Sequence, residues 1–295
     1  MAEFVSRISI VCFAASYAVA LACEASRPVF RSGIRGVVML GFAVAGFVAH
    51  TLFLVWRGVG ESGLPLSSPF DWYLLAAWIL AAGSLWLTIA NPRTPVGLFI
   101  LPVVLALVGA ATFASREPFL QSPAIRVWGS IHGSFNLAAS VSVAVGAVAG
   151  LMWLIQAGRL ARKEPPPRGF RMPRLERLAL LAHRCLAAAA WTAAAGFASG
   201  IVLNAVNRRH GLLETVPWTD PVVLRMGALV AWLIAADALA HAARRRAGGD
   251  RVTAWLALAS LGVLAASILW GILGPSQHGV RHVPPVPPPT SEAAP

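Results

Sequence analysis

Eight apolar segments, almost free of charged residues, run through this sequence. They lie at residues 8–23, 36–56, 71–90, 95–114, 132–156, 178–205, 221–243 and 253–273. We expect each to form a helix across a bilayer hydrocarbon core of about 30 Å. A helix satisfies its own backbone polar groups in lipid, and no alternating strand pattern competes with it. The sequence therefore predicts an all-α fold, a polytopic membrane bundle with a transmembrane helix for each of the eight segments.

The composition excludes an ordinary soluble domain. The chain is 57% hydrophobic and 12% charged, whereas soluble domains are about 25% charged. The net charge of +12 does not indicate nucleic-acid binding, because the basic residues lie between apolar segments, as topology signals do. We expect a lipid bilayer as the surroundings of this protein and no nucleic acid as a partner.

The distribution of basic residues predicts how the helices are oriented. With the connections assigned to alternate sides, sixteen of the twenty-four Lys and Arg residues fall on one side, many of them at 159–177 and 244–251. The positive-inside rule places that side in the cytoplasm and both termini outside. We assign 1–275 to a transmembrane domain. The Pro-rich stretch 276–295 is expected to be a disordered external tail.

Histidines in apolar surroundings are the main candidates for chemistry. The sequence has no nucleotide-binding loop, catalytic triad or zinc-binding spacing. An ionisable residue within a membrane suggests a function, and neutral imidazole is a common axial ligand of heme iron. Each histidine also has a plainer explanation, a hydrogen bond to a neighbouring helix. His132 and His278 fall at the outer ends of segments, where two helices can hold one ligand.

An outer loop supplies an aromatic candidate. It ends in Pro217-Trp218-Thr219-Asp220-Pro221. Trp218 suits stacking on a flat ligand, and it suits anchoring at the membrane interface about equally well. Asp237, inside the seventh segment, suits either pairing with a basic residue or a buried polar contact.

Several short motifs occur in an order typical of one membrane protein family. They are Ala49-His50-Thr51, Arg57, Gly63-Leu64-Pro65-Leu66-Ser67-Ser68 with Asp71 and Trp78, Leu120-Gln121-Ser122 with Ile131-His132-Gly133-Ser134, Leu175-Glu176-Arg177 with Gly196-Phe197 and Ser199-Gly200, and finally Ala240-His241-Ala242-Ala243-Arg244 with Ile272-Leu273-Gly274 and Gln277-His278-Gly279. This order resembles the cytochrome c assembly family, the CcsA-type heme-handling membrane proteins with their HemX-like members. The resemblance extends over most of the chain.

The resemblance implies a set of heme ligands. His132 and His278 resemble the two outer histidines that flank a tryptophan-rich loop and ligate heme iron at the external face, with Trp218 and Asp220 in that loop. His241 resembles an intramembrane heme ligand. His50 is its candidate opposite ligand, unless a membrane partner of the CcsB or ResB type supplies one. The resemblance also implies heme b as cofactor, apocytochrome c as acceptor and the bacterial inner membrane as location.

The signature loop departs from the family pattern. The family reads Trp-x-Trp-Asp-Pro-Lys-Glu, whereas this chain has one tryptophan out of register and Val222-Val223 in place of Lys-Glu. The family's earlier Asn and Glu are Ser68 and Asp71 here. We therefore expect a divergent member of the family.

Three functions remain open from the sequence. The first is carrying heme to the outer face and presenting it to apocytochrome c, at most as a subunit of a synthase complex. The second is a HemX-like membrane regulator of the level of a heme-biosynthetic enzyme. The third is a generic transporter with determinants around Asp237.

Overall fold

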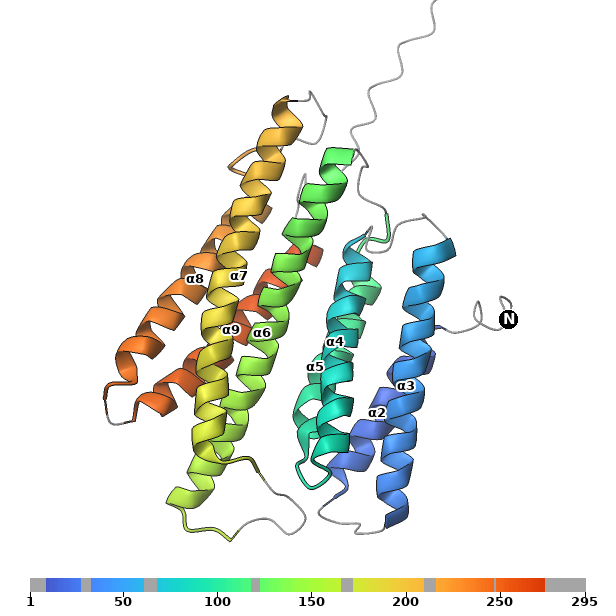
Figure 1. Cartoon of the computed structure of the whole chain (residues 1–295), viewed down its shortest axis with the longest axis vertical. Helices are drawn as coiled ribbons and strands as arrows, with labels where there is room; N and C mark the ends of the chain where they lie inside the picture. The colour runs from blue at the N-terminus through green and yellow to red at the C-terminus, as the bar shows by residue number, and fades with distance from the viewer. Residues whose placement is uncertain are drawn as a thin grey trace, which may run out of the picture.

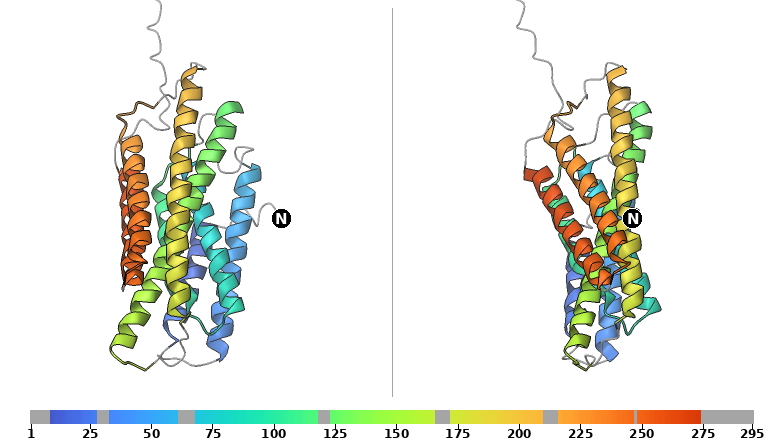
Figure 2. Two further views of the ribbon diagram at one scale, coloured as in Figure 1. Left: turned by 60° about the vertical axis from the view of Figure 1, so that its left-hand side comes forward. Right: turned by 90° about the vertical axis from the view of Figure 1, so that its left-hand side faces the viewer.

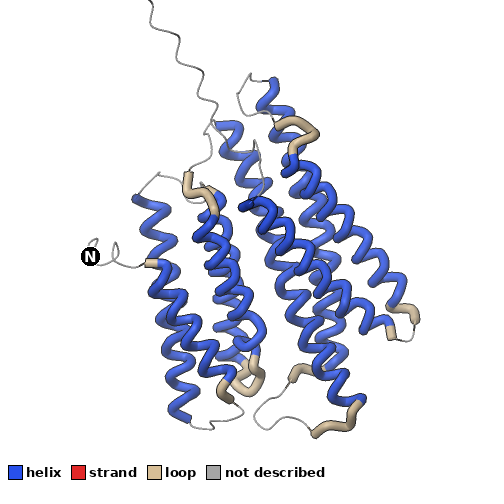
Figure 3. The backbone as a smooth tube through the Cα atoms, turned by 180° about the vertical axis from the view of Figure 1, so that it is seen from behind, coloured by secondary structure: helices blue, strands red, loops and turns tan. Residues whose placement is uncertain are grey.

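The computed structural model describes residues 9–27, 33–60, 68–117, 123–165, 172–209, 216–246 and 248–273. These residues form eight helices and no strand (Figure 3). The helices are α2 (Ile10–Ala25), α3 (Gly33–Gly60), α4 (Pro69–Ala90), α5 (Val96–Phe113), α6 (Pro123–Ala161), α7 (Leu175–Arg209), α8 (Pro221–Ala243) and α9 (Gly249–Leu273). Each predicted segment corresponds to one helix, so the prediction of an all-α, polytopic bundle is confirmed. The Pro-rich stretch 276–295 lies outside the described residues.

Seven of the helices, α3 to α9, are long and apolar enough to cross a membrane. Their outward faces carry large apolar side chains, such as Trp191, which is 77% exposed. Such a surface fits contact with lipid. The described part of α2 has 16 residues, about 24 Å at a rise of about 1.5 Å per residue. It packs against α3 and α5. The protein is therefore a multi-pass helical membrane protein.

Successive helices run antiparallel, and they form two groups of four (Figure 1). The connections around Arg93, at 162–174 and at 244–248 lie at one end, called the inner end here, and the opposite end is called the outer end. The first group is α2–α5. The second group is α6–α9, in which the α8–α9 pair packs against the α6–α7 pair (Figure 2). The packing boundary thus falls between α5 and α6, whereas the basic linker after α6 separates five helices from three along the sequence.

Two outer helix starts use a capping residue followed by proline. Ser68 precedes Pro69 in α4, and its side chain forms a capping box with Asp71. Asp220 precedes Pro221 in α8, and its Oδ1 accepts a hydrogen bond from the Val222 amide at 2.7 Å. A cap satisfies an amide at the helix start, and proline is tolerated there because its nitrogen carries no hydrogen.

The core extends from the first group into the second through α6. One cluster of buried apolar residues joins α2, α4 and α5 to α6 and to the inner parts of α7 and α8. A second cluster, including Ala139, Ala190, Leu233 and Leu264, lies within α6–α9. Small residues let the second group pack closely, since a Cβ at Gly150 of α6 would lie 2.8 Å from the Ala254 carbonyl oxygen of α9.

This close approach makes Gly150 a sensitive position. We expect Gly150→Val to force α6 and α9 apart and to lower the free energy of unfolding by about 1–3 kcal/mol, the range for overpacking. The matched control is Gly158→Val on the same helix, where a Cβ has no neighbour within 4 Å. Melting of both variants in detergent measures the difference. Equal stability of the two variants would contradict the packing described for α6 and α9.

Candidate functional site

His132 of α6 lies against α7 in the outer half of the second group. Its Nδ1 is 2.8 Å from the Gly196 carbonyl oxygen, and its Nε2 is 3.1 Å from Nδ2 of Asn136. The ring fits because a glycine faces it: a Cβ at Gly200 would lie 2.9 Å from His132 Cε1. The structure therefore brings together two motifs of the sequence, the histidine segment of α6 and the Gly-rich segment of α7.

The hydrogen bonds of His132 define its tautomer. A carbonyl oxygen only accepts, so Nδ1 donates to Gly196 and Nε2 accepts from the Asn136 amide. Metal-binding histidines usually donate from one ring nitrogen in this way and present the other to the metal. The Asn136 amide also donates to the His132 carbonyl oxygen at 2.9 Å. It therefore has a second acceptor when it turns away from Nε2.

A tryptophan of the first group lies beside this histidine. A Cβ at Gly133 would overlap the Trp72 ring at the outer end of α4. Only glycine at position 133 allows this approach, so Trp72 sits on α6 directly next to His132. The sequence offered one signal for this contact, the glycine that follows the histidine, but it did not indicate which aromatic residue packs there.

The outer connection between α7 and α8 is tied to α7. Asn204 donates to the Val216 carbonyl oxygen at 2.9 Å and accepts from the Val216 amide at 3.0 Å. Trp218 follows in a turn and is 51% exposed, so it is open to a ligand or to the membrane interface. Asp220 is 3% exposed and caps α8. Its geometry is that of a structural residue, which the sequence analysis did not anticipate.

His278, the predicted second outer ligand, lies outside the described residues. Its position follows from the chain alone: α9 ends at Leu273, at the outer end, and His278 is five residues further on. An extended residue spans at most about 3.6 Å. His278 is thus within about 18 Å of the end of α9.

His50 lies in the first group, within an aromatic cluster. It is 0% exposed and stacks on Phe13 with ring centroids 4.3 Å apart. Its Nδ1 is 3.3 Å from the Tyr17 hydroxyl, and its ring also faces the Leu74 backbone. Nε2 has no hydrogen-bond partner in the described part of the chain. These contacts enclose His50 and leave no opening for a porphyrin beside it.

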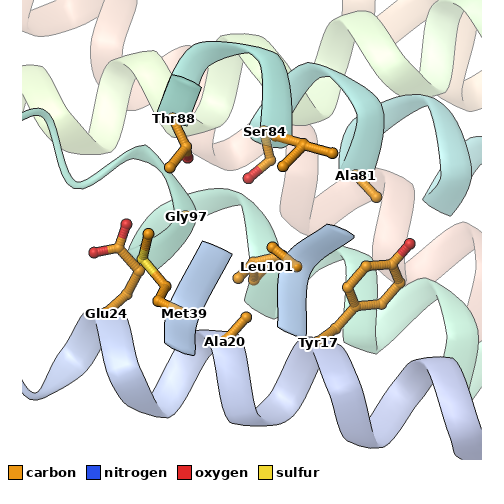
Figure 4. Close-up of a pocket in the computed structure, with 11 residues that line it drawn as sticks. Tyr17, Ala20, Glu24, Met39, Ala81, Ser84, Thr88, Gly97 and Leu101 are labelled. Carbon is orange, nitrogen blue, oxygen red and sulfur yellow. The ribbon is translucent and has the colours of Figure 1, made fainter. Parts of the chain in front are cut away.

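Tyr17 connects this cluster to a small cavity between α2, α3, α4 and α5 (Figure 4). The cavity measures about 20 Å³, enough for about one water molecule. Its polar lining consists of Tyr17, Glu24, Ser84 and Thr88. Tyr17 and Glu24 lie toward opposite ends of the cavity (Figure 4). A polar region therefore extends from the inner end of α2 to His50.

His241 lies at the inner end of α8 and is exposed. Its ring centroid is 6.1 Å from that of His183 on α7. The structure thus pairs His241 with a histidine to which the sequence analysis gave no role. It does not bring His241 and His50 together, because they lie in different groups and at different depths. Among the described residues, no cluster of three or more His, Cys, Asp and Glu side chains is arranged to hold a metal ion.

The fold and these contacts define the class, a multi-pass helical membrane protein with buried histidines in both groups of helices. No protein-family model, curated protein or solved structure matches this chain. The likeness to the cytochrome c assembly family therefore depends on the residues quoted from the sequence, and any functional conclusion depends on the geometry around them.

Proposed function

We propose that this protein handles heme in cytochrome c assembly and presents it at the outer face of the bacterial inner membrane. The observation that carries the proposal is His132, whose Nδ1 is held by the Gly196 carbonyl oxygen at 2.8 Å. This bond fixes the ring and directs Nε2 away from α7. Heme b is the cargo in this proposal, and an apocytochrome c and a CcsB- or ResB-type protein are its partners.

The residues around His132 fit a heme. Imidazole is a common axial ligand of heme iron, and aromatic rings provide flat apolar surfaces for the porphyrin. Trp72 adjoins His132, and Trp218 is half-exposed in the outer turn. The second axial ligand in this proposal is His278, which the chain places beyond the end of α9. Two axial imidazoles protect heme iron from other ligands until the porphyrin is transferred.

The inner part of the proposal differs from the expectation drawn from the sequence. His241 remains the candidate for receiving heme at the inner end, and His183 is the histidine beside it. His50 is enclosed by Phe13 and Tyr17 in the other group. We therefore do not assign His50 as the ligand opposite His241, and its contacts fit a role in packing the first group.

The absorption spectrum of the full chain, purified in detergent from heme-replete cells, tests this proposal. We expect a b-type heme spectrum, and we expect His132→Ala to reduce bound heme about tenfold or more, because it removes an iron ligand. The matched control is His183→Ala, which removes an imidazole near the inner end and leaves the outer site intact. A pyridine hemochrome assay quantifies the heme. Heme-free wild type that is folded and monodisperse would contradict the proposal.

One observation favours the second candidate, a HemX-like regulator that binds no heme. Both ring nitrogens of His132 already have protein partners, Gly196 and Asn136. Deleting the gene distinguishes the two functions. Loss of c-type cytochromes at normal levels of heme-biosynthetic enzymes supports heme handling. Altered enzyme levels with normal c-type cytochromes support regulation.

A further inference from the structure

Arg225 stands out because its charge has no partner. It lies just beyond the first turn of α8, in the outer half of the second group. Its Nε is buried without a hydrogen-bond partner. Within the described part of the chain, no hydrogen bond or ion pair engages its guanidinium group. Only Tyr73 and Asp220 lie within electrostatic range of it.

A glycine makes room for this guanidinium group. A Cβ at Gly271 of α9 would lie 2.9 Å from Nη2 and 3.0 Å from Nη1 of Arg225. The group therefore lies flat on the α9 backbone. An arginine that only anchors a helix extends toward the aqueous boundary. Arg225 instead turns sideways toward α9, within the bundle.

An unpaired guanidinium group at this depth requires an anion. Removing an ion from water costs several kcal/mol unless an opposite charge compensates it. Asp220 does not fill this role, because its Oδ1 caps α8 and it forms no salt bridge with Arg225. Tyr73 is a phenol and carries no charge at neutral pH. A carboxylate would match the planar donors of arginine.

Arg225 and His132 approach the same two residues of α4. Trp72 packs on Gly133, next to His132. Tyr73 is the neighbour of Arg225. Consecutive residues of a helix point about 100° apart, so the outer end of α4 lies between the histidine on one side and the guanidinium group on the other. A ligand held at His132 therefore has a cationic group near it.

We propose that Arg225, seated on Gly271, binds a carboxylate of the molecule that His132 ligates. This inference rests on the proposed function, in which that molecule is heme, whose two propionate groups are its carboxylates. Arg225 then orients the porphyrin, and His132 holds its iron. An anionic lipid phosphate is the competing occupant of the same position.

Binding of two porphyrins tests this inference. The heme-free full chain in detergent is titrated with hemin and with hemin dimethyl ester, which has no free carboxylate. Binding is read from the absorption change that His132→Ala abolishes. We expect the wild type to bind hemin about tenfold more tightly than the ester, as for one hydrogen bond to a charged group. Arg225→Gln should bind both equally. Arg209→Gln, an exposed arginine at the outer end of α7, should keep the preference.

A second variant keeps the charge and moves it. Gly271→Ala pushes the guanidinium group off the α9 backbone, and we expect it to weaken the preference for hemin while the protein stays folded. A preference that survives Arg225→Gln would overturn the inference, and so would equal binding by the wild type. If the wild type binds neither porphyrin, the proposed function fails as well.

A lipid arm identifies the competing occupant. Each protein is melted in detergent with added phosphatidylglycerol or with a zwitterionic lipid. We expect phosphatidylglycerol to stabilise the wild type and Arg225→Gln equally. Selective stabilisation of the wild type by phosphatidylglycerol, without discrimination between the porphyrins, would assign Arg225 to a lipid phosphate and overturn the inference.

Discussion

Asp71→Ala is expected to lower the free energy of unfolding by about 3 kcal/mol or more, because it breaks a buried ion pair and a helix cap at once. Asp71 is 4% exposed. Its Oδ1 accepts from Arg57 Nε at 2.5 Å. Its Oδ2 accepts from the Ser68 amide at 3.1 Å and from the Ser68 hydroxyl at 2.8 Å. This carboxylate thus joins α3 to the start of α4.

The surroundings of Asp71 increase the cost of losing its charge. Phe70 lies between two cations, with Arg57 Cζ 4.7 Å and Arg116 Cζ 4.9 Å from its ring centroid. Removing Asp71 leaves two positive charges near one ring without this carboxylate. Titration with a denaturing detergent measures the loss of stability.

Two further variants separate the cap from the charge. Asp71→Asn keeps an oxygen that can cap α4 but removes the charge, so its loss of stability should be smaller than that of Asp71→Ala. The double variant Arg57→Leu with Asp71→Leu should recover part of the loss, because no lone charge remains. If Asp71→Ala were as stable as the wild type, the ion pair would contribute nothing to the junction of α3 and α4.

The sequence predicted the helices well because a bilayer imposes their length and apolarity. It predicted their ends less well. The predicted segment 132–156 corresponds to α6, which has 39 residues, and hydropathy does not report polar turns that continue a helix beyond its most apolar part. The division into two groups of four could not be predicted, because it depends on backbone contacts at single glycines such as Gly150.

The candidate site was predictable only in part. The motifs around His132 and around Gly196 and Gly200 were recognised separately, and their contact requires the antiparallel pairing of α6 and α7. The partnership of His241 with His183 and the cradle of Arg225 on Gly271 join different helices, with no fixed spacing along the chain. The role of Asp220 was the reverse case, since a residue before proline at a helix start is a typical cap.

At the inner end, Glu24→Ala is expected to cost about 3 kcal/mol, because it leaves a buried arginine without its carboxylate. Glu24 is 1% exposed and forms an ion pair with Arg27. Arg27 Nη2 donates to Glu24 Oε1 at 3.0 Å, and Arg27 Nη1 donates to the Pro92 carbonyl oxygen at 3.0 Å. Arg35 adds a second positive charge nearby and donates to the Cys23 carbonyl oxygen at 2.7 Å. Without Glu24, two cations face each other.

The matched control is Glu176→Ala, an exposed acid in the first turn of α7, for which a change within about 0.5 kcal/mol is expected. Glu24→Gln tests the charge alone, because it keeps the shape of the side chain and its place beside Gly97. If charge balance is the cause, Glu24→Gln should lose most of the stability that Glu24→Ala loses. If filling the space beside the cavity is the cause, Glu24→Gln should resemble the wild type. Equal melting of Glu24→Ala and Glu176→Ala would show that Arg27 does not need Glu24, because Pro92 and the aqueous boundary already stabilise its charge.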